Sequence, residues 1–471
     1  MEENGNGMPL LSVIVSESAQ LRGETVTKGL NRIWWRCGYA GFSIALWLGL
    51  TVTSPGLAQI TPPVTHGVTA TSAEPYHLPP DKLEKAVVLG RIRPSLHFGA
   101  EFWQVGALWL LLATGAAAGL GQWVTTRTHR KWLQALIYSA LLAAIVFLIV
   151  DLPAGTIGHS VSLHYKISVE EWPAWFLDQA KTLGLVVLME TPLLMLGLGL
   201  ARRSPRWYWA WFAAAVAPIM ALVAFLLPPL VEPLFNHFEP LAQSHPALVA
   251  ELEKVVARTG TNIPRDRMFL MKASEKSNGL NAYVSGLGAS KRIVVWDTTA
   301  DRMPTDEILY TFAHEAGHYV LNHVAKGLTL AAVGMFALFA IVAKVSGWLV
   351  QKRGQAWQVD RVASLPGLVV LVLSLSLVQI VIESVPNIIS RHFEHDADVY
   401  GQEAIHGLVP DPRKTAVASF NRLGEAYLDD PQPNPFVVFW TEDHPSTQSR
   451  AKFAAQYDPW AICEQPKFFA K

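Results

Sequence analysis

The sequence is poor in charged residues and in cysteine. Only 16% of its 471 residues are charged, and 38 basic residues balance 38 acidic ones, so the formal net charge is zero. A balanced chain has no excess of basic residues to attract a polyanion, and we expect no nucleic-acid partner. Cys37 and Cys463, the two cysteines, define no disulfide framework, so the redox compartment stays open.

Long apolar runs stand where charge is missing. Hydrophobic residues make up 51% of the chain, and tryptophan occurs 17 times. About 20 apolar residues in a row are enough to cross a bilayer as a helix. Seven runs approach or reach that length, at residues 37–58, 102–124, 132–150, 182–201, 207–231, 327–350 and 365–383. They predict a mainly α, polytopic helical membrane protein with six or seven spans in a lipid bilayer.

The N-terminal region allows two interpretations. Basic residues precede the first apolar run, which ends in SPGLA with small residues at the spacing that signal peptidase prefers. We favour a cleaved signal peptide over a retained first helix for residues 1–58, which also contain an N-terminal extension. Residues 59–100 are expected to form a Pro/Thr-rich linker and an amphipathic region, and residues 101–231 a transmembrane helix bundle.

Two polar segments flank the last two apolar runs. Residues 232–326 precede them, residues 327–383 supply two transmembrane helices, and residues 384–471 follow. Because two successive spans return the chain to the same side, both polar segments lie on one face of the membrane. We expect them to form the two halves of one small α+β domain. Its predicted sheet comes from β-rich stretches at residues 267–274, 281–286 and 291–298.

The first polar segment contains HEAGH at residues 314–318. His314 and His318 are four residues apart, so on a helix they lie one turn apart on the same face and can hold one metal ion. Glu315 lies about 100° round that helix, where a general base can take a proton from a metal-bound water without ligating the metal. An amphipathic helix with three polar residues is the alternative, and a third ligand decides between the two.

The second polar segment offers that ligand. Asn387, Arg391, Glu394 and Asp398 follow at intervals of four, three and four, which places them on one helical stripe. If the HEAGH helix runs directly into the sixth span, Glu394 and His318 lie at similar heights above the membrane. A His, His, Glu set leaves one position of tetrahedral zinc open, as catalytic sites do, so we expect one Zn²⁺ per chain. Asp398 is placed to hold a ligand histidine by its second ring nitrogen, and we expect Arg391, on the same stripe, to support the ligands as well.

Five stretches in this order resemble the Ste24-type CAAX prenyl protease family. They are PLFNHFEPL at 233–241, NAYVSGLGASKRIVVWDT at 281–298, HEAGH, NIISRHFEHDAD at 387–398 and HPSTQSR at 444–450. The resemblance runs from about residue 74 to the end. It implies a membrane-integral zinc metallopeptidase whose catalytic domain is of the gluzincin type.

The resemblance also implies roles for single residues. The metal ligands and the general base are those named above. Asn281, in one strand with Ala282 and Tyr283, is expected to contact the substrate backbone. His444 is expected to stabilise the tetrahedral intermediate, although the residues alone place it in a surface turn. Arg450 has a structural or substrate-orienting role in this comparison.

The predicted function is a membrane-embedded zinc metalloendopeptidase that acts on peptide or protein substrates, some of them membrane-associated. One alternative is a quality-control protease of the HtpX type, which clears misfolded membrane or exported proteins. The other is a non-enzymatic, metal-handling membrane protein, although a metal carrier has no need of Glu315.

Loop charge predicts the orientation. Basic residues concentrate in the short loops at residues 122–131, 202–206 and 351–363, which the positive-inside rule places in the cytoplasm. The catalytic segments then face away from the cytoplasm, in a multi-pass protein of the cytoplasmic membrane. The resemblance implies the opposite for eukaryotic members, whose site faces the cytosol.

Overall fold

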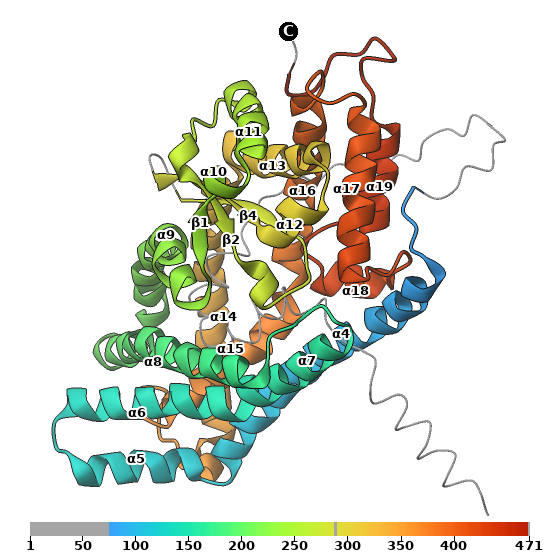
Figure 1. Ribbon diagram of the computed structural model, residues 1–471. Coiled ribbons are helices and arrows are strands. Elements are labelled where there is room, and N and C mark those ends of the chain that lie inside the picture. Colours follow the sequence, from blue (N-terminus) through green and yellow to red (C-terminus); the bar gives the residue numbers. More distant parts are fainter. Residues whose placement is uncertain (1–74, 287–289, 470–471) are drawn as a thin grey trace, which may run out of the picture.

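The computed structural model describes residues 75–286 and 290–469 (Figure 1). The first apolar run and most of the expected linker lie outside these ranges. Within them, long helices form one part of the molecule and a smaller mixed domain lies at one end of the bundle (Figure 1). The long helices are α4 (Pro80–Ala113), α5 (Ala116–Arg127), α6 (Lys131–Val146), α7 (Leu152–His164), α8 (Trp172–Arg203), α9 (Tyr208–Phe235), α14 (His323–Trp357) and α15 (Gly367–Ile382).

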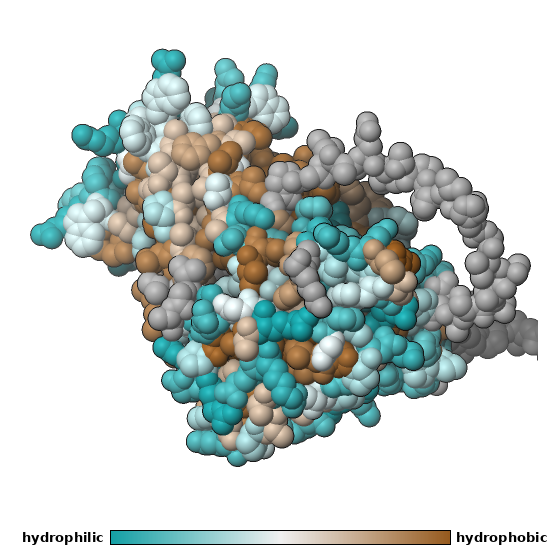
Figure 2. Space-filling view, turned by 90° about the horizontal axis from the view of Figure 1, so that it is seen from above, coloured by the Kyte–Doolittle hydropathy of each residue, from teal (hydrophilic) through white to brown (hydrophobic). Residues whose placement is uncertain are grey.

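The helices of the bundle are long enough to cross a membrane, and the bundle exposes large hydrophobic side chains. Among the described residues four helices are long and apolar enough to cross a bilayer, or up to six if each of two bent pairs counts as one span. A π-helical turn at Phe147–Asp151 joins α6 to α7 within one of them. Large apolar side chains such as Trp109, Leu188 and Trp211 are exposed. Figure 2 shows broad hydrophobic areas on one part of the molecule and a largely hydrophilic surface on the other. The predicted polytopic helical class is confirmed.

The second predicted span, residues 102–124, is not one straight helix. The chain breaks after α4 and turns by 60° into α5. Gly115 adopts a left-handed conformation there, with φ of 74°, which glycine takes without steric cost. Helix α4 also begins at Pro80 and runs through residue 100, where we expected the linker region to end. The prediction missed the break near Gly115 because apolar composition gives the length of a run but not the places where the helix is interrupted.

The mixed domain contains a four-stranded sheet and several helices. The strands β1 (Phe238–Pro240), β2 (Met268–Met271), β3 (Ala282–Ser285) and β4 (Arg292–Trp296) lie in the order β1-β2-β4-β3. The helices are α10 (Leu241–Ser244), α11 (Pro246–Thr259), α12 (Asp297–Arg302), α13 (Thr305–Val320), α16 (Ser384–Ala404), α17 (Pro412–Tyr427), α18 (Pro435–Thr441) and α19 (Thr447–Gln456).

The three predicted β-rich stretches are strands β2, β3 and β4. β3 and β4 pair antiparallel with Ala282 opposite Val295, while β2 pairs parallel to β4 with Met268 opposite Ile293. Every residue of β4 is buried, as expected of a central strand. Because the strand order ends with β3, this strand forms one edge of the sheet. β1, which lies within PLFNHFEPL, was not predicted.

The two polar segments share one hydrophobic core. It contains Leu270 and Phe312 from the first segment and Phe420 and Ala451 from the second. Leu89, on the first half of α4, joins the same core. The N-terminal half of α4 thus anchors the mixed domain to the helix bundle.

The expected continuous helix from HEAGH into the sixth span is wrong. Helix α13 ends at Val320, Asn322 takes a left-handed conformation with φ of 56°, and α14 begins at His323. Asparagine tolerates this conformation better than most residues, because its short polar side chain can bond locally. The chain therefore changes direction between the HEAGH helix and the span.

Helices α13 and α16 approach closely because two glycines lie at their contact. A Cβ at Gly401 would lie 3.0 Å from the backbone nitrogen of His314, and one at Gly317 would lie 3.0 Å from the ring of Tyr400. At Gly401 the obstacle is backbone, which cannot move aside without separating the helices. The pair of glycines thus sets the distance between HEAGH and the stripe on α16.

Gly401→Ala should therefore destabilise the protein, although alanine is the better helix former. We expect a loss of about 1–3 kcal/mol, the usual cost of overpacking, measured by thermal unfolding in detergent. Gly334→Ala on α14 is the matched control, because a Cβ added there would meet no atom within 4 Å. Equal stability of the two variants would contradict the close packing of α13 on α16.

Candidate metal centre

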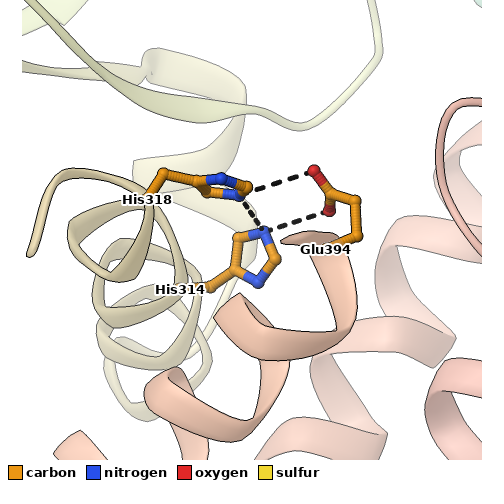
Figure 3. Close-up of side chains that lie close together, drawn as sticks. All are labelled: His314, His318 and Glu394. Atoms are coloured by element: carbon orange, nitrogen blue, oxygen red, sulfur yellow. Dashed lines mark hydrogen bonds and ion pairs between the residues drawn. The ribbon is translucent and has the colours of Figure 1, made fainter. Parts of the chain in front are cut away.

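His314 and His318 on α13 meet Glu394 on α16 in a compact cluster (Figure 3). Nε2 of His314 lies 3.2 Å from Nε2 of His318. The carboxylate of Glu394 lies 3.3 Å from Nε2 of His314 and 3.4 Å from Nε2 of His318. All three side chains are at least four-fifths buried. The structure brings together the three predicted ligands.

The spacing of these atoms fits a tetrahedral ion. Zinc binds imidazole nitrogen and carboxylate oxygen at about 2.0–2.2 Å, so its ligand atoms lie roughly 3.3–3.5 Å apart. The three distances above agree with that value. Oε2 of Glu394 is buried, and its neighbours include the ring nitrogens Nε2 of His314 at 3.3 Å and Nε2 of His444 at 3.2 Å, so a metal ion would find this oxygen directed at the same place as the imidazoles. The residues therefore fit a zinc ion.

Asp398 lies behind His314, one turn after Glu394. Its Oδ1 is 2.9 Å from Nδ1 of His314, which leaves Nε2 of the same ring directed at the cluster. Arg450 on α19 grips this carboxylate with two hydrogen bonds, from Nε at 2.8 Å and from Nη2 at 2.6 Å. Burial raises the pKa of Asp398, but Arg450 and His314 outweigh burial and hold it at about 2. Asp398 is thus an anion that orients His314.

The two histidines have opposite proton affinities. Burial lowers the pKa of His318 to about 3, so its ring is neutral and ready to ligate. Burial also disfavours the charged form of His314, but hydrogen bonds to Asp398 and Glu394 outweigh it and raise its pKa to about 10. A metal ion must therefore displace the proton on Nε2 of His314 when it binds.

Glu315 lies next to the cluster without joining it. It is half-buried on α13, and burial raises its pKa to about 6. A carboxylate with such a pKa is ionised at neutral pH and basic enough to accept a proton. Its carboxylate is close enough to His314 and Glu394 for their charges to affect this pKa.

Comparison with known proteins identifies the family. Residues 242–458 match the description "Peptidase family M48", and residues 70–237 match "CAAX prenyl protease N-terminal, five membrane helices". The chain belongs to the Ste24-type CAAX protease family. It is therefore a multi-pass membrane metallopeptidase, which agrees with the helix bundle and the cluster on α13 and α16.

Relatives share much of the chain at moderate identity. "Uncharacterized metalloprotease YhfN" of Bacillus subtilis is 29% identical over 83% of this chain and 90% of that protein. "CAAX prenyl protease 1" of Saccharomyces cerevisiae is 28% identical over 57% of this chain and 62% of the yeast protein. The crystal structure of S. mikatae Ste24p has the same fold, with a TM-score of 0.67 and 20% identity over 96% of this chain and 100% of that one.

His444 of this Ste24-type protein lies in the loop between α18 and α19, as the residues alone predict. Its Nε2 is 3.2 Å from Oε2 of Glu394, and its Nδ1 is 2.8 Å from Oδ1 of Asp443. The loop therefore carries an imidazole to the edge of the metal cluster. Only the resemblance pointed to this position.

Arg391 differs from expectation. It points to α18 rather than to the ligand histidines, and its guanidinium donates to the carbonyls of Val438 and Glu442. Asn387, one turn earlier, donates to the carbonyl of Trp440 at 2.6 Å. The long side chain of Arg391 extends to α18 instead of to the candidate metal ligands. The first half of the stripe thus holds α18, which leads to His444, and the second half faces the metal cluster.

The predicted substrate strand lies beside the metal helix. Tyr319 of α13 donates its hydroxyl to the carbonyl of Val284 in β3 at 3.2 Å. The backbone N–H of Asn281 donates to Oγ1 of Thr299 at 2.7 Å, which fixes the start of the strand. Tyr283 donates its hydroxyl to the carboxylate of Glu232 at 2.8 Å, and Ala282 is buried.

His323 was missed by the sequence analysis. Its Nδ1 lies 3.2 Å from Nδ1 of His318, and its ring stacks on Phe393 with 3.7 Å between centroids. On a continuous helix, five residues would rotate it about 140° away from His318. The break at Asn322 places the His323 ring next to that of His318. The sequence HEAGHYVLNH includes His323, but it does not reveal this break in the helix. His392 and His395, which flank Glu394 on α16, are exposed.

Asp398→Asn should weaken zinc binding about 10–100-fold, because the amide can no longer fix the tautomer of His314 as an anion does. Competition with a chromophoric chelator measures the affinity. Asp396→Asn is the matched control on the same helix, since its carboxylate pairs with Lys467 at 2.7 Å instead. Equal zinc affinity of the two variants would remove Asp398 from the site.

Proposed function

We propose that the protein is a zinc endopeptidase in which Glu315 activates water for attack on a peptide bond. The observation that carries this proposal is the triangle of His314, His318 and Glu394 at tetrahedral spacing. Three ligands leave one tetrahedral position for water, and this, with the nearby carboxylate of Glu315, is typical of a catalytic rather than a structural metal site. A metal carrier would need the triangle but not the base.

The chain's own groups divide the work of hydrolysis. When bound, zinc would supply a Lewis acid for the peptide carbonyl and lower the pKa of the attacking water. The carboxylate of Glu315 takes the proton of that water and passes it to the leaving amine. Nε2 of His444, at the rim of the cluster, donates a hydrogen bond to the developing oxyanion. The edge strand β3, with Asn281 at its start, aligns the substrate backbone.

Cleavage of an unstructured reporter protein by the detergent-purified chain tests the proposal. We expect turnover that a zinc chelator abolishes and that about one equivalent of Zn²⁺ restores. Turnover that resists the chelator would contradict a metal-dependent site. No turnover of any reporter by the zinc-loaded protein would favour a strictly selective protease or a non-enzymatic metal protein.

We propose a broad substrate class, namely exposed segments of membrane-associated or exported proteins, rather than prenylated peptides alone. The yeast relative is a CAAX prenyl protease, so a prenylated C-terminal peptide is the competing substrate. Paired peptides with and without a farnesyl group separate the two. Equal cleavage of both supports the quality-control function, whereas cleavage of the farnesylated peptide alone would contradict it.

We further propose that the mixed domain faces away from the cytoplasm. The basic loops support this, and two of them meet, because Nε of Arg202 donates to the carbonyl of Ala363 at 3.2 Å. Cys463 is exposed in the mixed domain and provides a natural probe. In a Cys37→Ser background it should react with a membrane-impermeant thiol reagent in intact cells. Reaction only after lysis would place the domain in the cytoplasm.

A further inference from the structure

A second cluster of metal-ligand type lies outside the peptidase centre. We propose that His97, Glu101 and Glu383 bind a divalent transition-metal ion, such as Zn²⁺ or Mn²⁺, that braces the mixed domain on the helix bundle. His97 and Glu101 belong to α4, and Glu383 lies at the bend between α15 and α16. This site is separate from the peptidase function and does not depend on it.

The three side chains converge as ligands do. Nε2 of His97 lies 3.0 Å from Oε1 of Glu383 and 3.6 Å from Oε1 of Glu101. One ligand atom from each residue lies within 4.8 Å of the other two. His97 and Glu101 are four residues apart, so one turn of α4 presents both on the same face, as α13 does with its two histidines.

Burial makes a cation favourable at this cluster. The side chain of Glu383 is 4% exposed, that of His97 14% and that of Glu101 24%. Two carboxylates held together away from bulk water repel each other, and a divalent ion placed between them offsets this repulsion. One imidazole with two carboxylates suits zinc or manganese better than the all-oxygen sites that calcium and magnesium prefer.

The position of Glu383 gives the ion a mechanical role. The chain bends by 48° where α15 passes into α16, and α16 carries Glu394 eleven positions later. Helix α4 runs along α15, and Gln104 of α4 donates to Oγ of Ser376 on α15 at 2.9 Å. An ion held by Glu383 and the two α4 residues therefore fixes the bend from both sides.

Helix α18 packs against α4 and α15 next to this bend. The ring of Phe436 on α18 lies 6.4 Å from that of Phe98, the neighbour of His97. Nε1 of Trp440 donates to the carbonyl of Ile380, one turn before Glu383, at 3.2 Å. The chain after α18 leads to His444. An ion at this bend would therefore stabilise α16, which carries Glu394, and the position of α18, which precedes the loop of His444.

Metal stoichiometry in the full-length, detergent-purified protein tests the site. After equilibrium dialysis against Zn²⁺ or Mn²⁺, we expect about two ions per wild-type chain and about one in His318→Ala, which disables the peptidase centre. Adding Glu383→Gln to His318→Ala should remove the remaining ion. Adding Glu84→Gln instead, an exposed acid on α4, should leave it bound.

Two results would overturn the proposal. One is a folded His318→Ala protein that binds no ion, which would leave His97 only as a hydrogen-bond partner of Glu383. The other is an ion that persists after Glu383→Gln and His97→Ala. If His318→Ala does not fold, the comparison uses Glu383→Gln alone. Its metal content should fall from about two ions per chain to about one, and saturating metal should raise its unfolding temperature less than that of the wild type.

Discussion

Glu315→Gln should reduce kcat/KM for reporter cleavage by about 10²–10⁴-fold while the bound zinc stays unchanged. Glutamine has the size of glutamate but cannot accept a proton at neutral pH. Glu315 contributes no atom to the cluster of His314, His318 and Glu394, so the metal loses no ligand. Paired measurements of turnover and of zinc per chain on the same preparation give both results.

Asp306→Asn is the matched control for this variant. It makes the same chemical change in the first turn of α13, more than two turns from the cluster. We expect its activity to stay close to that of the wild type. Loss of zinc in Glu315→Gln would make Glu315 a ligand or a structural residue, and retained turnover would place the base elsewhere. A metal transporter would transport equally well with either residue.

The cluster of His314, His318 and Glu394 was predictable because its members depend on local periodicity. HEAGH and the stripe on α16 each obey the helical repeat, and each lies next to a span whose apolar length is evident in the sequence. Only the meeting of the two helices needed an argument about topology. Gly317 and Gly401 at that contact were not identified, because their importance comes from what faces them.

The parts that escaped prediction depend on backbone breaks and distant partners. Gly115 and Asn322 end helices inside runs that remain apolar or helical in pattern, so composition continues where the structure turns. His323 became part of the site through the second break. The partners of Arg391 lie about 50 residues away on α18, a distance that no helical repeat covers. His444 was found only through the resemblance, since a loop residue has no periodicity.

Arg450→Met should lower the free energy of unfolding by about 3–5 kcal/mol, because it leaves the carboxylate of Asp398 buried without its main counter-charge. The side chain of Asp398 is 3% exposed and that of Arg450 15%, so solvent screens the pair weakly. Arg413→Met is the control. Its ion pairs with Asp411 and Asp458 lie at the surface, where they contribute less than about 1 kcal/mol.

Removing both partners separates the pair's own contribution from the cost of an orphaned charge. Asp398→Asn with Arg450→Met removes both charges of this pair, so the double variant should be more stable than Arg450→Met alone. Thermal unfolding of the metal-free proteins in detergent gives the comparison. A double variant that is less stable than the single one would mean that Arg450 stabilises the fold through other contacts.

The pH dependence of Arg450→Met follows from the pKa of Asp398. In the wild type this pKa is about 2, below the ordinary 3.8, so the carboxylate stabilises the fold above pH 4 and this contribution is lost as the pH falls from about 4 to 2. Without Arg450 the pKa of Asp398 rises, and the carboxyl takes up a proton at higher pH. The stability deficit of Arg450→Met should therefore be greatest near pH 8 and smaller at pH 5. A deficit that is constant between these values would show that the lost stability does not come from the charge of Asp398.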